Sequence, residues 1–219
     1  MDYAQIDNAV RRGVAADWVP RWALAVLRDI VSGRRELTAV RHPLGFLCLP
    51  VQRGGEDGVC VHMWTPALRP AVTTSQVHSH SWDLTSYVLY GTLHNRHVRV
   101  TETPATATHR VFEVHSHGDV DELRATGRLV SCEPELDSAS YGGGCLYLLP
   151  AGEFHSTDVA GGQDVATVVL GRTRPAAADL SLGPLSTASH RLTRSRCDRG
   201  ETVRAALFIA EQLEAAVNA

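Results

Sequence analysis

Three histidines in two separate segments are the residues of this chain best suited to metal chemistry. His78 and His80 stand two positions apart in a segment of strand-like composition, and alternate side chains of a strand point to the same face. His155 lies much later, at the end of the sequence PAGEFH. If a neighbouring strand carried it to the same face, three imidazole nitrogens would surround one ion, and such nitrogens bind Fe, Ni, Cu and Zn. The spacing therefore predicts a three-histidine metal site.

The second histidine segment resembles one of the two signature motifs of the cupin superfamily. That motif is G-x5-P-x-G-x2-H-x3-N, and the chain matches it at Gly144, Pro150, Gly152 and His155. Val159 replaces the final Asn. A glycine permits a sharp turn and a proline fixes the backbone before the histidine, so the matched positions have a physical role.

The first histidine segment matches the other cupin motif, G-x5-H-x-H-x3,4-E-x6-G, in part. His78, His80 and Gly91 stand at the family's positions, but Leu84 or Thr85 occupies the position of the glutamate ligand. Three neutral histidines without a carboxylate leave a divalent ion with its full double charge. This resembles the three-histidine iron site of the thiol dioxygenases, the cupin branch that includes cysteine and cysteamine dioxygenases. The resemblance implies Fe(II) as cofactor, with Ni, Mn and Zn as alternatives.

The resemblance covers roughly residues 44–172 and implies oxidation of a small, thiol-bearing, amino-acid-like metabolite by dioxygen. Two departures argue against cysteine itself. The early segment GFLCLPV lacks the family's substrate-binding arginine, with Arg53 lying just after it, and no tyrosine follows His155. Two other classes stay open: a metal-dependent isomerase, lyase or decarboxylase that uses no oxygen, and a cupin that binds a small molecule without catalysis.

Aromatic and acidic residues near the histidine segments are the further candidates for the site. Tyr87, Tyr90 and Tyr147 flank the histidine strands, and a hydroxyl near the metal could donate a proton or a hydrogen bond, although aromatic residues in strands more often belong to the core. Asp83 could replace the missing glutamate, but a regular strand would point it away from the histidines. Asp158 could instead orient a histidine from behind.

The other histidines fit a metal site less well. His115 and His117 form a second HxH pair, but Gly118 and Asp119 follow it directly, and the strand and glycine pattern of the first cupin motif is missing. A solvated strand end is therefore favoured for this pair. His62, His94 and His97 could face the interior of a barrel, although an isolated histidine in a strand is usually a surface or core residue.

Short segments rich in β-branched and aromatic residues must position these side chains. Gly, Pro, Asp and Thr separate the segments, and little helix is indicated between them, which is typical of an antiparallel sandwich or barrel. The predicted fold is all-β, a cupin jelly-roll barrel with N- and C-terminal helical appendages. We expect a helical segment over 1–40, the barrel over 41–175, and an irregular segment with a C-terminal helix over 176–219. A short turn of helix is expected within 118–127.

Two amphipathic helices are predicted outside the barrel. Residues 17–33 carry apolar side chains at helical spacing and end at Gly33. A final helix over about 199–217 begins with a capping box, Asp198 followed by Glu201.

The composition is typical of a soluble globular protein. Of the 219 residues, 44% are hydrophobic and 21% charged, and the net charge of −3 gives no attraction to nucleic acid or an anionic membrane. No apolar stretch has the length of a transmembrane helix, and the N-terminus lacks a signal-peptide core. Five widely spaced cysteines without a CxxC pair favour a cytoplasmic protein with reduced thiols. The expected partners are a small-molecule substrate and dioxygen, and the cupin resemblance allows a homodimer.

Overall fold

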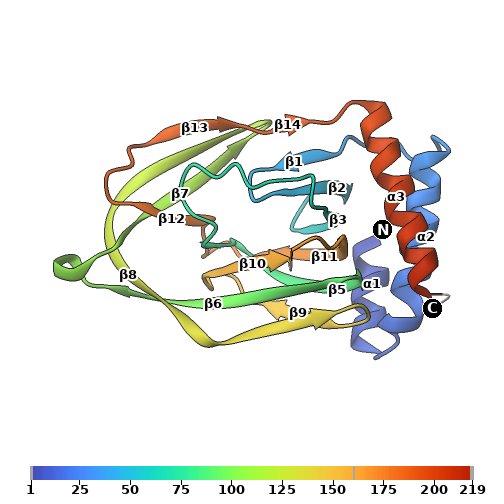
Figure 1. The fold of residues 1–219 in the computed structure, drawn as a ribbon, viewed down its shortest axis with the longest axis horizontal. Coiled ribbons are helices and arrows are strands. Elements are labelled where there is room, and N and C mark those ends of the chain that lie inside the picture. Colours follow the sequence, from blue (N-terminus) through green and yellow to red (C-terminus); the bar gives the residue numbers. More distant parts are fainter. Residues whose placement is uncertain (1, 160, 218–219) are drawn as a thin grey trace.

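Two antiparallel sheets form the body of the protein, and helices cover one of them (Figure 1). The computed structural model describes residues 2–159 and 161–217. The helices in these ranges are α1 (Asp2–Arg11), α2 (Ala15–Val31) and α3 (Arg199–Val217), with a 3-10 turn η1 (Pro104–Thr106). In spatial order, the first sheet consists of β14 (Ser195–Arg196), β1 (Val40–His42), β2 (Phe46–Gln52), β3 (Asp57–Trp64), β11 (Val165–Thr173), β5 (Trp82–Tyr90) and β9 (Leu146–Leu149). The second sheet consists of β13 (His190–Thr193), β8 (Val120–Gly142), β6 (Thr92–Glu102), β10 (His155–Val159), β4 (His78–Ser79), β12 (Leu180–Pro184) and β7 (His109–His117).

Eight of these strands have the connectivity of a jelly roll. β3, β11, β5 and β9 lie side by side in the first sheet, and β4, β10, β6 and β8 lie side by side in the second. When these eight strands are numbered 1 to 8 along the chain, the first sheet contains 1, 8, 3 and 6, and the second contains 2, 7, 4 and 5. This order is the double Greek key of a jelly roll. The predicted fold class, an all-β jelly-roll barrel with helices at both ends, is confirmed.

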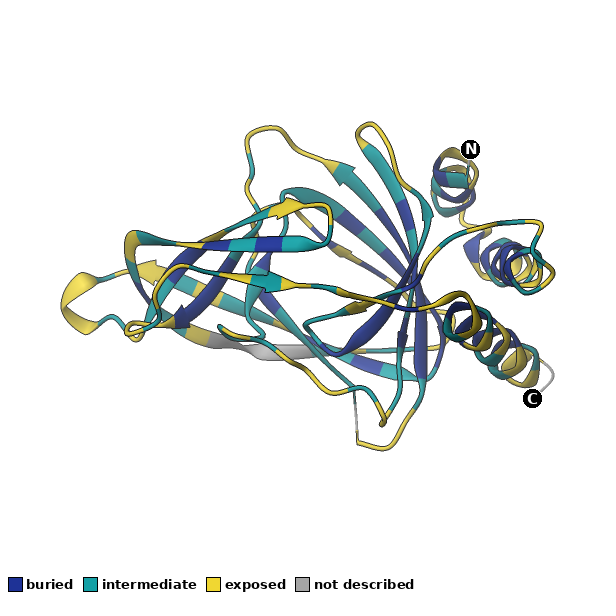
Figure 2. Ribbon diagram, turned by 90° about the horizontal axis from the view of Figure 1, so that it is seen from above, coloured by how far each residue is buried: buried dark blue, intermediate teal, exposed yellow. Residues whose placement is uncertain are grey.

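The helices pack on the outer face of the first sheet (Figure 2). Ile6, Leu27 and Ile209, one from each helix, are fully buried in a cluster that also contains Leu49 and Val168 of the sheet. Burying an aliphatic side chain of this size contributes on the order of 1.5–3 kcal/mol. The helices therefore hold in place the sheet whose other face forms one wall of the interior.

Both predicted helices are present. The capping box of α3 is formed as predicted, since the N–H of Asp198 donates to Oε2 of Glu201 (2.8 Å) and the N–H of Glu201 donates to Oδ1 of Asp198 (2.7 Å). α1 lacks a clear signal in the sequence, because its buried stripe consists only of Tyr3, Ile6 and Ala9. Within the described ranges, no helix combines the length and apolar character needed to cross a lipid bilayer.

Two segments differ from the prediction. Residues 118–127 form no helical turn; they belong to the β7–β8 hairpin, whose turn contains Gly118 at a φ of 62°. The part of 176–219 that precedes the C-terminal helix is not irregular, because it contains β12, β13 and β14, each paired with a strand from earlier in the chain. These pairings join segments that are distant in sequence, so local composition gives no sign of them. β12 lies directly beside β4, and the chain after the barrel thus completes the sheet that carries the HxH pair.

Candidate metal centre

The structure brings His78, His80 and His155 together between the two sheets. β10 runs antiparallel to β4, and His155 is the direct cross-strand partner of His78. The donor atoms of the three side chains all lie within 4.8 Å of one another, and the ring centroids are between 4.4 and 5.1 Å apart. An ion at about 2.0–2.1 Å from each nitrogen fits among these rings after small rotations of the side chains.

Two of the histidines are held in the tautomer that leaves Nε2 available to a metal. Nδ1 of His78 lies 2.8 Å from the carbonyl oxygen of Gln76, and Nδ1 of His155 lies 3.3 Å from the carbonyl oxygen of Glu153. A carbonyl oxygen only accepts hydrogen bonds, so Nδ1 carries the proton in both rings and Nε2 keeps its lone pair. Support of this kind from behind is typical of metal-bound histidines.

Burial keeps all three imidazoles neutral. Desolvation lowers the pKa of His78, lowers the pKa of His80 well below its usual value, and lowers the pKa of His155 to about 3. For His80 and His155, the neighbouring imidazoles lower the pKa further, because a second positive charge in the cluster is unfavourable. At neutral pH the cluster therefore offers lone pairs without any charge of its own, which suits a cation.

The loop before His155 joins the two histidine segments through backbone contacts. Gly152 has a φ of 85°, in the left-handed region that glycine adopts without strain. Its N–H donates to the carbonyl oxygen of His80 (2.9 Å), and the N–H of Ala151 donates to Oδ1 of Asp83 (3.0 Å). The second motif is thus fixed against the strand that follows the first.

The candidate carboxylates are engaged elsewhere. Among the described residues, the group of donor atoms at this site holds three histidines and no acidic side chain. Asp83 accepts a hydrogen bond from Nε of Arg174 (2.6 Å), and this contact, with the bond from Ala151, lowers the pKa of Asp83. Asp158 pairs with Arg96 at 3.3 Å and its side chain is 42% exposed. The structure therefore gives Asp83 a role in positioning the loop.

The three candidate tyrosines lie on two different faces of the first sheet. Tyr147 lines the cavity that contains the histidines, and burial raises the pKa of its hydroxyl. Tyr87 and Tyr90 pack in the cluster beneath the helices and do not line the cavity. A regular strand would place Tyr90 on the same face as Val88, but β5 has a bulge where Ala166 pairs with Tyr90 and the next residue of β11 pairs with Val88. The bulge turns Tyr90 toward the helices.

The histidines line a cavity of about 520 Å³ between the sheets. Trp82 and Leu84 form part of its apolar wall, and the ring of Trp82 packs on the ring of His80 with centroids 4.2 Å apart. Gly171 makes this packing feasible, because a Cβ atom there would lie 2.8 Å from the Trp82 ring. A cavity of this size and mixed lining suits a small metabolite.

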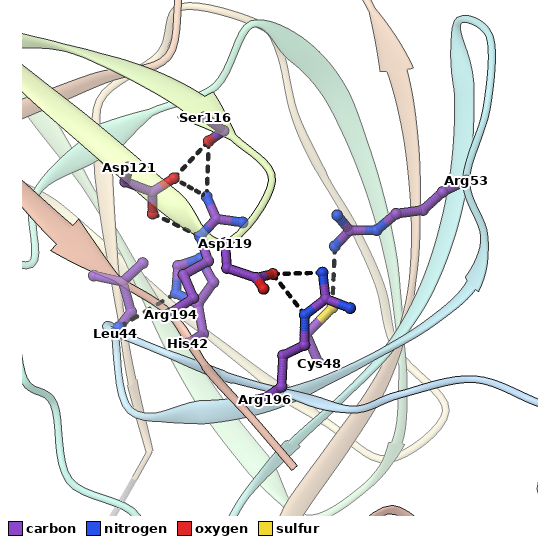
Figure 3. A network of polar contacts seen from close by, with 9 residues as sticks. All are labelled: His42, Leu44, Cys48, Arg53, Ser116, Asp119, Asp121, Arg194 and Arg196. Carbon is purple, nitrogen blue, oxygen red and sulfur yellow. Dashed lines mark hydrogen bonds and ion pairs between the residues drawn. The ribbon is translucent and has the colours of Figure 1, made fainter. Parts of the chain in front are cut away.

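A polar network contributes to the lining of the cavity (Figure 3). Arg194 donates two hydrogen bonds of 2.6 Å to the carboxylate of Asp121 and one of 2.9 Å to Ser116. The two charged side chains are only 18% and 7% exposed, and the paired geometry offsets the cost of removing them from water. The network ties the chain after β13 to the β7–β8 hairpin.

A second group of metal-ligating side chains lines the same cavity. Cys48, Cys60 and His62 have donor atoms within 4.8 Å of one another. The prediction treated His62 only as a residue that could face the interior, and the two cysteines were not candidates. The spacing of Cys60 and His62, two positions apart in one strand, is the signal that could have identified this wall.

Comparisons with known proteins found only distant similarity to solved structures. No protein-family model matches the chain, and no curated protein shows significant sequence similarity to it. The solved structures that resemble it include the polyketide cyclase RemF from Streptomyces resistomycificus, with 15% identity and a TM-score of 0.35 over 70% of this chain and 78% of that one. They also include KdgF from Halomonas sp., with 11% identity and a TM-score of 0.35 over 64% and 89% of the two chains. A hydroquinone 1,2-dioxygenase from Sphingomonas sp. TTNP3 has 14% identity and a TM-score of 0.34 over 58% and 65%. Similarities at this level assign no activity, so the function is argued from the site alone.

Proposed function

We propose that the chain is a metal-dependent oxygenase in which His78, His80 and His155 hold one Fe(II) ion. Its substrate is a small, thiol-bearing, amino-acid-like metabolite that binds in the cavity together with dioxygen. The observation that carries the proposal is the cluster of three neutral imidazoles, one buried and two partly buried, with no carboxylate among its donor atoms in the described residues.

The absence of an acidic ligand from this cluster determines the kind of substrate that fits. When bound, such an ion supplies Lewis acidity and open positions for a chelating substrate and for dioxygen. Neutral imidazoles cancel none of its charge, so the site favours an anionic ligand such as a thiolate over a neutral one. The cavity volume of about 520 Å³ limits that ligand to a small metabolite.

Residues around the cluster hold the ligands in place and add apolar surface beside them. Trp82 lies against the His80 ring and restricts its rotation. The carbonyl oxygens of Gln76 and Glu153 fix the rings of the other two histidines. Leu84 and Leu149 add apolar surface to the cavity wall, and an apolar wall strengthens the attraction between the ion and an anionic substrate.

Metal analysis of the purified protein tests the site, and oxygen uptake tests the reaction. Protein made without added metal should carry one divalent ion, and His155→Ala should lose it. His115→Ala is the matched control, because this half-exposed histidine pairs with Glu113 on β7. Unchanged metal content in His155→Ala would overturn the site.

The Fe(II) form should then be screened anaerobically against thiols and amino acids by thermal shift, since a ligand that binds the native state raises its melting temperature. A stabilising thiol should be consumed with uptake of dioxygen. Turnover without oxygen uptake would overturn the oxygenase proposal and favour an isomerase or lyase at the same metal site.

A further inference from the structure

We propose that Cys48, Cys60 and His62 form a second metal site, which binds one Cu(I) ion in the opposite wall of the cavity. The site shares no ligand with the three-histidine cluster and does not depend on the proposed oxygenase function. It lies on β2 and β3 of the first sheet, whereas the three histidines lie on or beside β4 and β10 of the second.

Strand register brings the three side chains together. β2 and β3 are antiparallel neighbours, and Cys48 is the direct cross-strand partner of His62. Cys60 precedes His62 by two positions, so both side chains leave β3 on the same face. The three donor atoms lie within 4.8 Å of one another. A trigonal ion at about 2.3 Å from each sulfur requires sulfurs about 4 Å apart, which this group can supply.

The three side chains are largely buried in the sheet, but they line the cavity. Cys48 is 4% exposed, Cys60 and His62 are partly buried, and all three line the cavity. Phe46 packs on the His62 ring with centroids 4.5 Å apart, and the His42 ring stacks on the other side of Phe46 at 4.4 Å. This packing limits the rotation of the imidazole. An ion can therefore reach a site whose ligands are already held together.

The local charges select a monovalent, thiophilic ion. The guanidinium of Arg53 lies 3.8 Å from the sulfur of Cys48 (Figure 3), and among the described residues it has no carboxylate partner. Two thiolates carry a double negative charge, and Arg53 cancels half of it. One Cu(I) ion makes the group neutral with these three ligands. Zn(II) would leave a net positive charge and, because structural zinc takes four ligands, would need a further anionic ligand that the group does not supply. Thiolate sulfur is also the preferred ligand of Cu(I).

Competition with a chromophoric Cu(I) chelator tests the site under anaerobic, reducing conditions. The full-length wild-type protein should withdraw one equivalent of Cu(I) from the chelator. His155→Ala should do the same, because it removes only the other site, and failure of the proposed oxygenase function would leave this result unchanged. Cys60→Ser should lose tight binding, and His62→Ala should weaken it at least tenfold.

Two controls keep the experiment decisive. Cys145→Ser removes an exposed cysteine outside the cavity and should bind Cu(I) as the wild type does. Circular dichroism of Cys60→Ser and His62→Ala should match that of the wild type, and Cys60 is partly exposed, so its replacement is tolerable. If Cys60→Ser does not fold, His62→Ala alone decides whether binding depends on the site.

Three results would overturn the proposal. The first is a reduced wild-type protein that withdraws no Cu(I). The second is Cu(I) binding that is unaffected in folded Cys60→Ser and His62→Ala. The third is Zn(II) binding through the same residues that is tighter than Cu(I) binding.

Discussion

Position 91 accepts only glycine, because any side chain there would strain the backbone and clash with its neighbours. Gly91 lies between β5 and β6, matches the last glycine of the first cupin motif, and has a φ of 76°. An L-residue in this left-handed conformation costs about 1–2 kcal/mol. A Cβ atom there would also overlap the carbonyl oxygen of Asp164 and approach Cγ2 of Val165 to 2.8 Å. Forcing a methyl group into a packed site adds about 1–3 kcal/mol.

Gly91→Ala should therefore lower the free energy of unfolding by about 2–5 kcal/mol, a large fraction of the total stability of a domain. Two other glycines separate the contributions. In Gly118→Ala the new Cβ atom has no neighbour within 4 Å, but the residue has a φ of 62°. This variant should therefore lose only about 1–2 kcal/mol, which is the cost of the left-handed conformation. Gly127→Ala has neither a positive φ nor a close neighbour and should change little.

Urea unfolding of the metal-free variants, with the slope checked to be unchanged, measures the three values. The expected order of destabilisation is Gly91→Ala, then Gly118→Ala, then Gly127→Ala. If Gly91→Ala loses no more stability than Gly118→Ala, the clash with Asp164 and Val165 does not exist in the protein, and the placement of this turn is wrong.

The remaining predictions concern the cavity and its support. Gly171→Ala should push Trp82 away from His80 and weaken metal binding, as measured by chelator competition. Gly161→Ala should leave metal binding unchanged, because a Cβ atom at that position has no neighbour within 4 Å. Equal metal affinities in the two variants would refute the role of this packing. Arg194→Leu should destabilise the protein by about 3–5 kcal/mol in thermal unfolding, because it leaves the buried Asp121 carboxylate with only the Ser116 hydroxyl and no charged partner. The double variant with Asp121→Leu should lose less, and a double variant that loses more than Arg194→Leu alone would contradict this account. Asp83 has a pKa lowered by Arg174 and by the Ala151 N–H, so its contribution to stability is present above the ordinary pKa of an aspartate and is lost as the pH falls through the lowered value. Asp83→Asn should accordingly flatten the acid limb of a stability–pH profile measured by urea unfolding, and an unchanged limb would show that these contacts do not form.

The three-histidine cluster could be predicted because its signals are local. Two histidines separated by one residue share a face, and the turn that carries His155 needs Gly152 at a positive φ. Only one long-range pairing, His78 opposite His155, had to be supplied by the fold. The cupin motifs supplied it by resemblance.

The other wall of the cavity could not be predicted in the same way. Cys48 joins Cys60 and His62 only through the register of β2 on β3, and a shift of one residue would send its side chain to the helices. Tyr90 shows the same limit within a single strand, because one bulge reverses the face expected from alternation. Register and bulges depend on the partner strand, which local sequence does not reveal.

The short strand β4 determines when the proposed metal site can form. Its two residues are held by β10 on one side and by β12 on the other, and both neighbours are synthesised long after it. Pairings between segments so distant in sequence require the closure of long loops and slow the folding of the chain. The proposed ion would therefore bind only after β10 has been made and paired with β4. A fragment that stops at residue 175 would contain every histidine of the cluster, yet β4 would lack β12 and present an open edge to solvent.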